Sequence, residues 1–184
     1  GITGESGSGK STLFYLLLGL LIPEKGNIFF QGKSIFNNLE NWRKKIGYIS
    51  QNVFLFDGTI KDNISFNLSE KNKFNDKELI DKVIEISQLR KTIDQMPNKL
   101  ETLAGSNGIK LSGGEKQRIA AARTLYRKPD IIFLDEFTSS LDLENEQKIT
   151  EGILKFAKGK TIFLITHRHQ LLEFCNINII LKNG

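Results

Sequence analysis

The chain has 184 residues, of which 39% are hydrophobic and 26% are charged, and only 3 are proline. This length and composition support one globular domain, or a compact domain with a small subdomain, and exclude long disordered linkers. The net charge of +5 comes from scattered lysines and is typical of a solvated face rather than of contact with lipid or nucleic acid. A single cysteine, Cys175, excludes an internal disulfide and suits a reducing compartment.

The apolar periodicity predicts short strands that alternate with helices. Residues 1–3 are interpreted as the end of a strand that leads into a glycine-rich loop, and a buried helix is expected over 12–21. The apolar run at 13–22, which overlaps this helix, falls short of the roughly 20 residues that a bilayer requires. Further strands are expected at 27–30, 46–50, 130–135, 161–166 and 178–181, and further helices at 76–87, 112–127, 143–157 and 170–174.

This alternation predicts an α/β fold with a mostly parallel central sheet flanked by helices. The runs at 131–134 and 162–165 are apolar throughout, which is typical of central strands covered on both faces. Residues 52–126 carry mostly helical patterns, so a helical subdomain is expected there. Ser112 and Glu115 have the spacing of a capping box and predict a helix that begins at this point. We interpret 1–184 as one domain, a fragment that lacks its first strands and its C-terminal end.

The loop at the start of the chain, GESGSGKS, matches G-x-x-x-x-G-K-[ST] at every fixed position. Its glycines let backbone N–H groups point at phosphate oxygens, and the helix that follows adds the positive end of its dipole. Lys10 is expected to reach the terminal phosphates and Ser11 to ligate magnesium. The predicted nucleotide-binding residues here are Gly4, Glu5, Ser6, Gly7, Ser8, Gly9, Lys10, Ser11 and Thr12.

A second feature of phosphate chemistry is IIFLDE, an apolar strand that ends in Asp135 and Glu136. Paired with the loop above, Asp135 is expected to hold magnesium through water, and Glu136 to polarise the attacking water.

A further motif, LSGGEKQR at residues 111–118, resembles the signature of ATP-binding cassette (ABC) ATPases. Gln51 resembles the family's Q-loop, SSLD at 139–142 its D-loop, and His167 its switch histidine. The resemblance runs from the first residue to the last and implies a P-loop NTPase fold that binds ATP and Mg²⁺. It implies catalytic roles for Glu136, His167 and Gln51, and a metal set of Ser11, Gln51 and Asp135. The further nucleotide contacts that it implies are Gln51, Ser112, Gly113, Gly114, Glu115, Asp142 and His167.

The resemblance also answers why one chain carries two anion-binding loops. In this family two cassettes meet head to tail, and each ATP is held by the phosphate loop of one and the signature helix of the other. Ser112 and Gly114 would therefore bind the partner's γ-phosphate, and Asp142 would communicate across the interface. Glu115 stands where Gln is commonest, and activity is expected to survive this change. The implied partner is a second nucleotide-binding domain, identical or not, and no nucleic acid.

Residues 52–64, NVFLFDGTIKDNI, resemble the exporter stretch that faces the coupling helices of a membrane domain. Residues 104–115 resemble the exporter loop that leads into the signature, with Ser106 in place of the usual acidic residue. Within exporters, the sequence resembles bacterial lipid-linked oligosaccharide flippases and, equally, lipid, peptide or multidrug exporters. This implies a transmembrane domain fused in front of the chain and a location at the cytoplasmic face of the cell membrane.

Two alternatives to the exporter interpretation stay open. The first is a soluble cassette ATPase that acts on DNA or on ribosomes. In this family the DNA-acting members carry a long coiled coil between the positions of Gln51 and Leu111, and the ribosome-acting members carry two cassettes. The second alternative is the ATPase subunit of an importer, and the exporter-like stretch at 52–64 argues against it.

Overall fold

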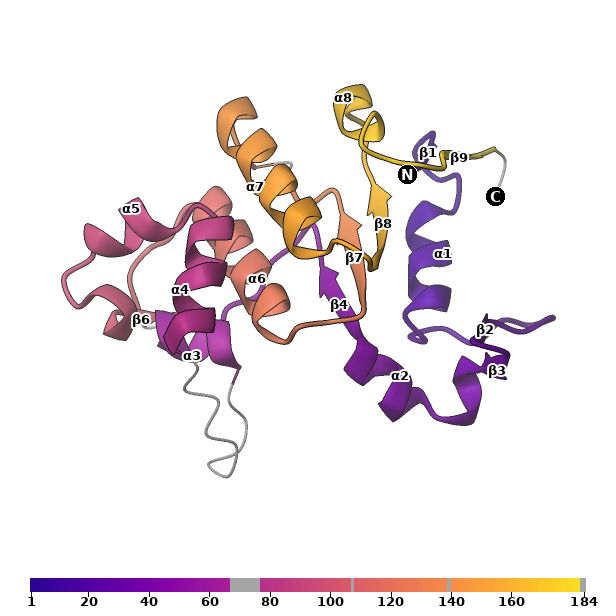
Figure 1. Ribbon diagram of the computed structural model, residues 1–184, viewed down its shortest axis with the longest axis horizontal. Coiled ribbons are helices and arrows are strands. Elements are labelled where there is room, and N and C mark those ends of the chain that lie inside the picture. Colours follow the sequence, from indigo (N-terminus) through magenta and orange to yellow (C-terminus); the bar gives the residue numbers. More distant parts are fainter. Residues whose placement is uncertain (67–76, 107, 139, 183–184) are drawn as a thin grey trace. The chain divides into compact units, whose positions relative to one another are not determined.

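The computed structural model describes residues 1–66, 77–106, 108–138 and 140–182 (Figure 1). The chain forms two compact units. The first comprises Gly1–Tyr48, Pro129–Glu136 and Lys160–Gly184, and the second comprises Ile49–Lys128 and Phe137–Gly159. Among the described residues, no helix combines the length and the apolar character needed to cross a bilayer.

The largest sheet of the described residues has five strands in the order β4-β7-β8-β1-β9. β1 pairs in parallel with both β8 and β9, and β7 pairs in parallel with β8. Every residue of β7 is buried, as predicted for a central strand. The predicted α/β fold with a mostly parallel sheet is confirmed. The strands are β1 (Ile2–Gly4), β4 (Ile46–Ile49), β7 (Ile131–Asp135), β8 (Thr161–Ile165) and β9 (Ile179–Leu181).

An aromatic contact anchors α1 to this sheet. The rings of Phe14 and Phe133 meet edge to face with centroids 5.2 Å apart, and Phe133 stacks on Phe163 at 4.8 Å. Such pairs add to the burial of apolar area that stabilises the core. The remaining elements of the first unit are α1 (Lys10–Leu17), β2 (Phe29–Phe30), β3 (Lys33–Ser34), η1 (Ile35–Asn37), α2 (Leu39–Lys45) and α8 (His169–Leu172).

The helix expected over 12–21 is only partly correct, because α1 ends at Leu17. Gly19 has φ 67, a left-handed conformation that turns the chain away from the helix. A Cβ at this position would lie 2.6 Å from a methyl carbon of Leu39, so the close packing here also favours glycine. Leu20 and Ile22 are 57% and 77% exposed. The apolar run therefore does not form one buried helix.

The second unit is mostly helical in its described part, and α6 lies at its centre. Helices α3 and α4 both pack against α6, and α4 also contacts α7. The fully buried side chains include Ile60, Ile84, Ile119 and Leu125. Its elements are β5 (Gly58–Thr59), α3 (Ile60–Ser65), α4 (Lys77–Ile86), α5 (Arg90–Asp94), η2 (Lys99–Glu101), β6 (Leu103–Ala104), α6 (Gly113–Tyr126) and α7 (Leu143–Phe156). Asp76, the first residue of the helix expected over 76–87, lies outside the described residues.

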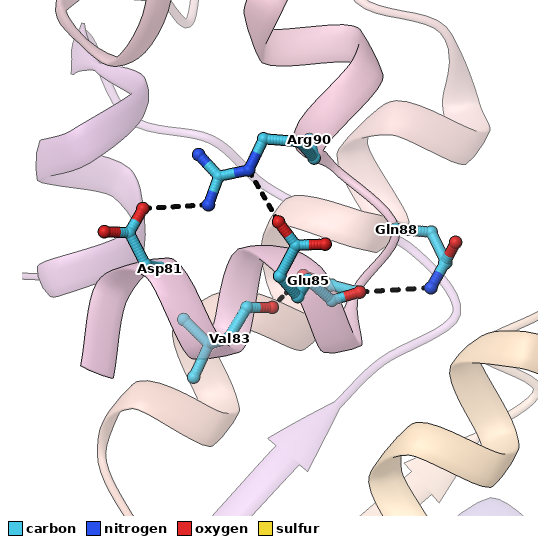
Figure 2. Close-up of polar contacts among 6 residues, drawn as sticks. Asp81, Val83, Glu85, Gln88 and Arg90 are labelled. Atoms are coloured by element: carbon cyan, nitrogen blue, oxygen red, sulfur yellow. Dashed lines mark hydrogen bonds and ion pairs between the residues drawn. The ribbon is translucent and has the colours of Figure 1, made fainter. Parts of the chain in front are cut away.

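Two arginines of this unit have contrasting environments. Arg90 pairs with Asp81 at 2.8 Å and with Glu85 at 2.6 Å where α4 leads into α5 (Figure 2), and all three side chains are more than a third exposed. Arg123 on α6 instead lies beside the paired rings of Phe56 and Phe66, whose centroids are 5.5 Å apart, with its guanidinium carbon 5.7 Å from each centroid. It donates hydrogen bonds to Asn63 O at 2.7 Å, Asn63 Oδ1 at 2.8 Å and Phe54 O at 3.0 Å.

Arg123→Lys should destabilise the second unit far more than Arg90→Lys. Lysine cannot reproduce a planar fork that lies against two rings and donates to several acceptors, and the buried Asn63 would lose its two hydrogen bonds from Arg123, at a cost of about 2 kcal/mol. Exposed ion pairs contribute at most about 1 kcal/mol. Amide hydrogen exchange in α3 and α6 of the full-length protein measures the difference. Equal protection in the two variants would contradict this account.

Candidate active site

The glycine-rich loop follows β1 and leads directly into α1. A Cβ on Gly4 would lie 2.5 Å from both Leu181 O and Ser8 Oγ, so only glycine fits between the loop and β9. Gly9 has φ 89 and precedes the first helical residue, Lys10. Because α1 begins there, its first N–H groups point into the loop and can donate to an anion.

A cavity of ≈ 880 Å³ opens over this loop, lined by residues 3–8, Thr166, His167, Leu172 and residues 180–182. Ser8 is 7% exposed, and its Oγ has no hydrogen-bond partner within the described ranges. Lys10 is equally buried, and its Nζ donates to Gly4 O and Glu5 O at 2.8 Å each. A buried hydroxyl without a partner and an ammonium held by loop carbonyls fit a ligand that is rich in anionic oxygen.

The two acids at the end of β7 face different surroundings. Asp135 is only 8% exposed, and its Oδ2 accepts a hydrogen bond from Tyr48 Oη at 3.1 Å. Glu136 has φ 45, a left-handed conformation that is uncommon for a residue with a side chain, and its N–H donates to Ile165 O at 3.0 Å. His167 follows β8, and its Nε2 lies 2.9 Å from Glu136 Oε1. A carboxylate oriented by an imidazole can accept a proton from water.

Burial raises the pKa of Asp135 above that of an ordinary aspartate. The hydrogen bond from Tyr48 and the charge of Lys10 oppose this shift, while the charge of Glu136 adds to it. Burial therefore makes the ionised form of this carboxylate less stable than that of an exposed aspartate, as is common at functional sites.

The signature residues lie at the start of α6 in the second unit. Ser112 is the N-cap, and its Oγ accepts from Glu115 N at 3.3 Å. Glu115 Oε2 accepts from Ser112 N at 2.7 Å and lies 2.8 Å from Ser112 Oγ, which completes the predicted capping box. A Cβ on Gly114 would lie 3.0 Å from Ser140 O, so the next loop packs closely against this helix end. Gln51 is exposed in the same unit.

Asp142 is the N-cap of α7. Its carboxylate accepts hydrogen bonds from the backbone N–H of Asn145 at 3.0 Å and from the side chain of Asn145 at 2.6 Å. These bonds, the backbone one first, lower the pKa of Asp142. Ser139, at the start of the predicted D-loop, lies outside the described residues. Ser140 N donates to Gln117 Oε1 at 3.2 Å and so joins this loop to α6.

The structure therefore brings the phosphate loop, Asp135, Glu136 and His167 together in the first unit, and Gln51, the signature and Asp142 belong to the second. The sequence reasoning missed Tyr48. Its position on the strand before Gln51 is visible in the sequence, but only strand order places β4 beside β7.

A phosphate-binding loop between a strand and a helix, with a buried aspartate on a parallel strand of the same sheet, defines a P-loop nucleotide-binding protein. The ABC transporter family model matches residues 1–139. The chain belongs to the ABC transporter family, and it corresponds to the ATPase domain of that family's exporters.

Two relatives and one solved structure illustrate the similarity. The chain is 40% identical over 166 residues to a "Multidrug resistance ABC transporter ATP-binding and permease protein" of Lactococcus lactis subsp. lactis (strain IL1403), covering 90% of this chain and 28% of the relative. It is 40% identical over 185 residues to a "Putative export ATP-binding/permease protein" of Rickettsia bellii (strain RML369-C), and this match covers 100% of this chain and 31% of the relative.

The structure superimposes with a TM-score of 0.90 and 33% identity on that of a bacterial Atm1-family ABC exporter with ATP bound, covering all of this chain and 32% of the other. The chain thus spans less than a third of the proteins that it matches.

Asp135→Asn should raise the thermal stability of the nucleotide-free protein in chelator at pH 7. A folded-state pKa above the unfolded one contributes stability that is present at low pH and is lost as the pH rises through the folded pKa. Asparagine is neutral throughout and escapes this loss. The gain should shrink as the pH falls toward about 3.9, the ordinary aspartate value.

The melting temperature of the full-length protein between pH 4 and pH 7 measures this effect. Asp130→Asn, just before the other end of β7, is the matched control, because its side chain is 60% exposed and pairs with Lys45. A lower melting temperature for Asp135→Asn than for wild type at pH 7 would contradict the expected sign.

Proposed function

We propose that this chain is the ATP-binding and ATP-hydrolysing domain of an ABC exporter, which powers movement of a substrate across a membrane through ATP-driven association of two such domains. The observation that carries the proposal is the convergence of the phosphate loop, Asp135, Glu136 and His167 in one unit. The relatives support the export assignment, because their names join ATP-binding with permease or export functions.

In this proposal the triphosphate lies along the phosphate loop, and Lys10 exchanges its contacts with loop carbonyls for the β- and γ-phosphates. Mg²⁺ would be held by the Ser11 hydroxyl, by Asp135 through water and by Gln51. Hydroxyl, amide and carboxylate oxygens are the ligands that this ion prefers. When bound, Mg²⁺ neutralises charge on the phosphate oxygens.

Glu136 acts as the general base. Its carboxylate accepts a proton from water while the water oxygen bonds to the γ-phosphorus, and the bond from the γ-phosphorus to the β–γ bridging oxygen breaks to give ADP and inorganic phosphate. His167 orients Glu136 through their 2.9 Å contact and also contacts the γ-phosphate.

The signature of a second copy, or of a related cassette, completes the site. Ser112 and Gly114 would bind the γ-phosphate held by the partner's phosphate loop, aided by the dipole of α6, and Asp142 would communicate between the two sites. In the chain without a partner, the Ser112 N–H donates to the carboxylate of Glu115. We propose that this hydrogen bond breaks when the Ser112 N–H donates to the γ-phosphate instead. Loss of the γ-phosphate then releases the dimer.

The membrane domain is the second proposed partner, and it would hold this domain at the cytoplasmic face of the membrane. A cavity of ≈ 490 Å³ in the second unit lies between residues 53–55 on one side and residues 105–106 and 108–111 on the other, and Phe54 beside it is 77% exposed. An exposed phenylalanine at a concave surface supports docking of a segment from the membrane domain. An oligosaccharide-lipid, lipid, peptide or drug substrate is compatible with this arrangement.

Glu136→Gln in the full-length protein should bind ATP normally, lose at least about 100-fold in turnover and accumulate as a closed dimer, because a glutamine cannot accept the proton. Phosphate release, nucleotide titration and light scattering measure these effects. Glu144→Gln, an exposed change on α7, is the control. Unchanged turnover in Glu136→Gln would remove this residue from the role of base.

Ser112→Arg should leave ATP binding to the phosphate loop intact but prevent ATP-induced dimerisation, because a long cation replaces the small N-cap. Ser34→Arg is a matched control, since Ser34 caps η1 in the first unit and its loss tests capping alone. Light scattering with ATP in a hydrolysis-deficient background distinguishes the two variants. Dimerisation of Ser112→Arg at the wild-type ATP concentration would contradict the composite site.

A further inference from the structure

Tyr48 is a polar side chain in contact with the proposed metal carboxylate that has no part in the mechanism above. It lies on β4, which neighbours β7 in the sheet, and its Oη donates to Asp135 Oδ2 at 3.1 Å. The donor and the acceptor are 87 residues apart in the sequence. The contact therefore exists only because β4 and β7 are adjacent.

The burial of Asp135 and the packing of Tyr48 make this hydrogen bond important for the orientation of the carboxylate. Asp135 is 8% exposed, so water offers its carboxylate little compensation, and a buried acceptor without a donor is costly. Tyr48 is half-buried, and its ring packs against the core that contains Phe14 and Phe133. The packed ring fixes the phenol, and the phenol in turn constrains one oxygen of the carboxylate.

We infer that Tyr48 is a positioning residue for the metal site: it holds Asp135 Oδ2, so that the carboxylate keeps one orientation toward the water of a bound Mg²⁺. This inference rests on the proposed role of Asp135 in holding the metal. Outer partners of this kind fix a ligand's orientation and thereby raise metal affinity. In this inference Tyr48 acts through Asp135 and not by contact with nucleotide or metal.

A role of Tyr48 in core packing alone and a role in positioning Asp135 predict different effects on metal affinity. Tyr48→Phe keeps the ring and its packing and removes only the hydroxyl. If Tyr48 serves the core alone, this variant leaves metal binding unchanged. If it positions Asp135, metal affinity falls while nucleotide affinity without metal stays the same, because Lys10 and the loop are intact.

The test uses the full-length protein with Mn²⁺ as the probe metal and a non-hydrolysable ATP analogue. Mn²⁺ affinity is read by electron paramagnetic resonance, and affinity for the analogue is read separately in EDTA. Tyr48→Phe should weaken Mn²⁺ binding about fivefold, the net effect of one hydrogen bond, and leave the affinity in EDTA unchanged. Tyr15→Phe, a half-exposed tyrosine on α1, is the matched control and should change neither affinity.

Asp135→Asn distinguishes a failure of the Tyr48 positioning role from a failure of the proposed metal role of Asp135. If it weakens Mn²⁺ binding and Tyr48→Phe does not, the positioning role is overturned while the proposed function stands. If neither variant changes Mn²⁺ affinity, the metal role of Asp135 fails and the inference fails with it. If Tyr48→Phe lowers affinity in EDTA as much as in Mn²⁺, the hydroxyl supports the fold of the loop and the positioning role is also overturned.

Discussion

The parallel pairing of β1, β8 and β7 is the constraint on which the site depends. Parallel strands end at the same edge of a sheet, so the residues that follow each strand are gathered there by backbone hydrogen bonds alone. The phosphate loop follows β1, Glu136 follows β7 and His167 follows β8. Three segments that are distant in the sequence thereby become one chemical centre.

Three features at the same edge of the sheet are costly to the fold. Asp135 is a buried acid with a raised pKa, Glu136 holds a left-handed backbone conformation, and Ser8 has a buried hydroxyl without a partner in the described part of the chain. Each of these costs stability. The surrounding core, with Phe14 packed on Phe133, offsets the cost and holds the charged groups in place.

The second unit supplies a different kind of recognition. Its signature serine begins a 14-residue helix, and this helix is tied by Arg123 to the segment around Phe54 and Asn63. One compact unit therefore carries both the surface proposed to receive a membrane domain and the helix end proposed to meet the partner's nucleotide. This linkage offers a physical route by which docking in the membrane domain and closure of the nucleotide site influence each other.

The sequence by itself determined the phosphate loop, the acids at the end of β7 and the capping box at Ser112, because each depends on residues that are close together in the chain. The alternation of strands with helices predicted the parallel sheet, although the strands that pair in it are far apart in the chain. It mispredicted the end of α1, because the apolar run continues past Gly19, where a left-handed backbone conformation follows the end of the helix. It gave no sign of the Tyr48–Asp135 contact or of the hydrogen bonds from Arg123 to Asn63. These contacts join residues 87 and about 60 positions apart, and only the order of strands and the packing of helices decide which distant side chains meet.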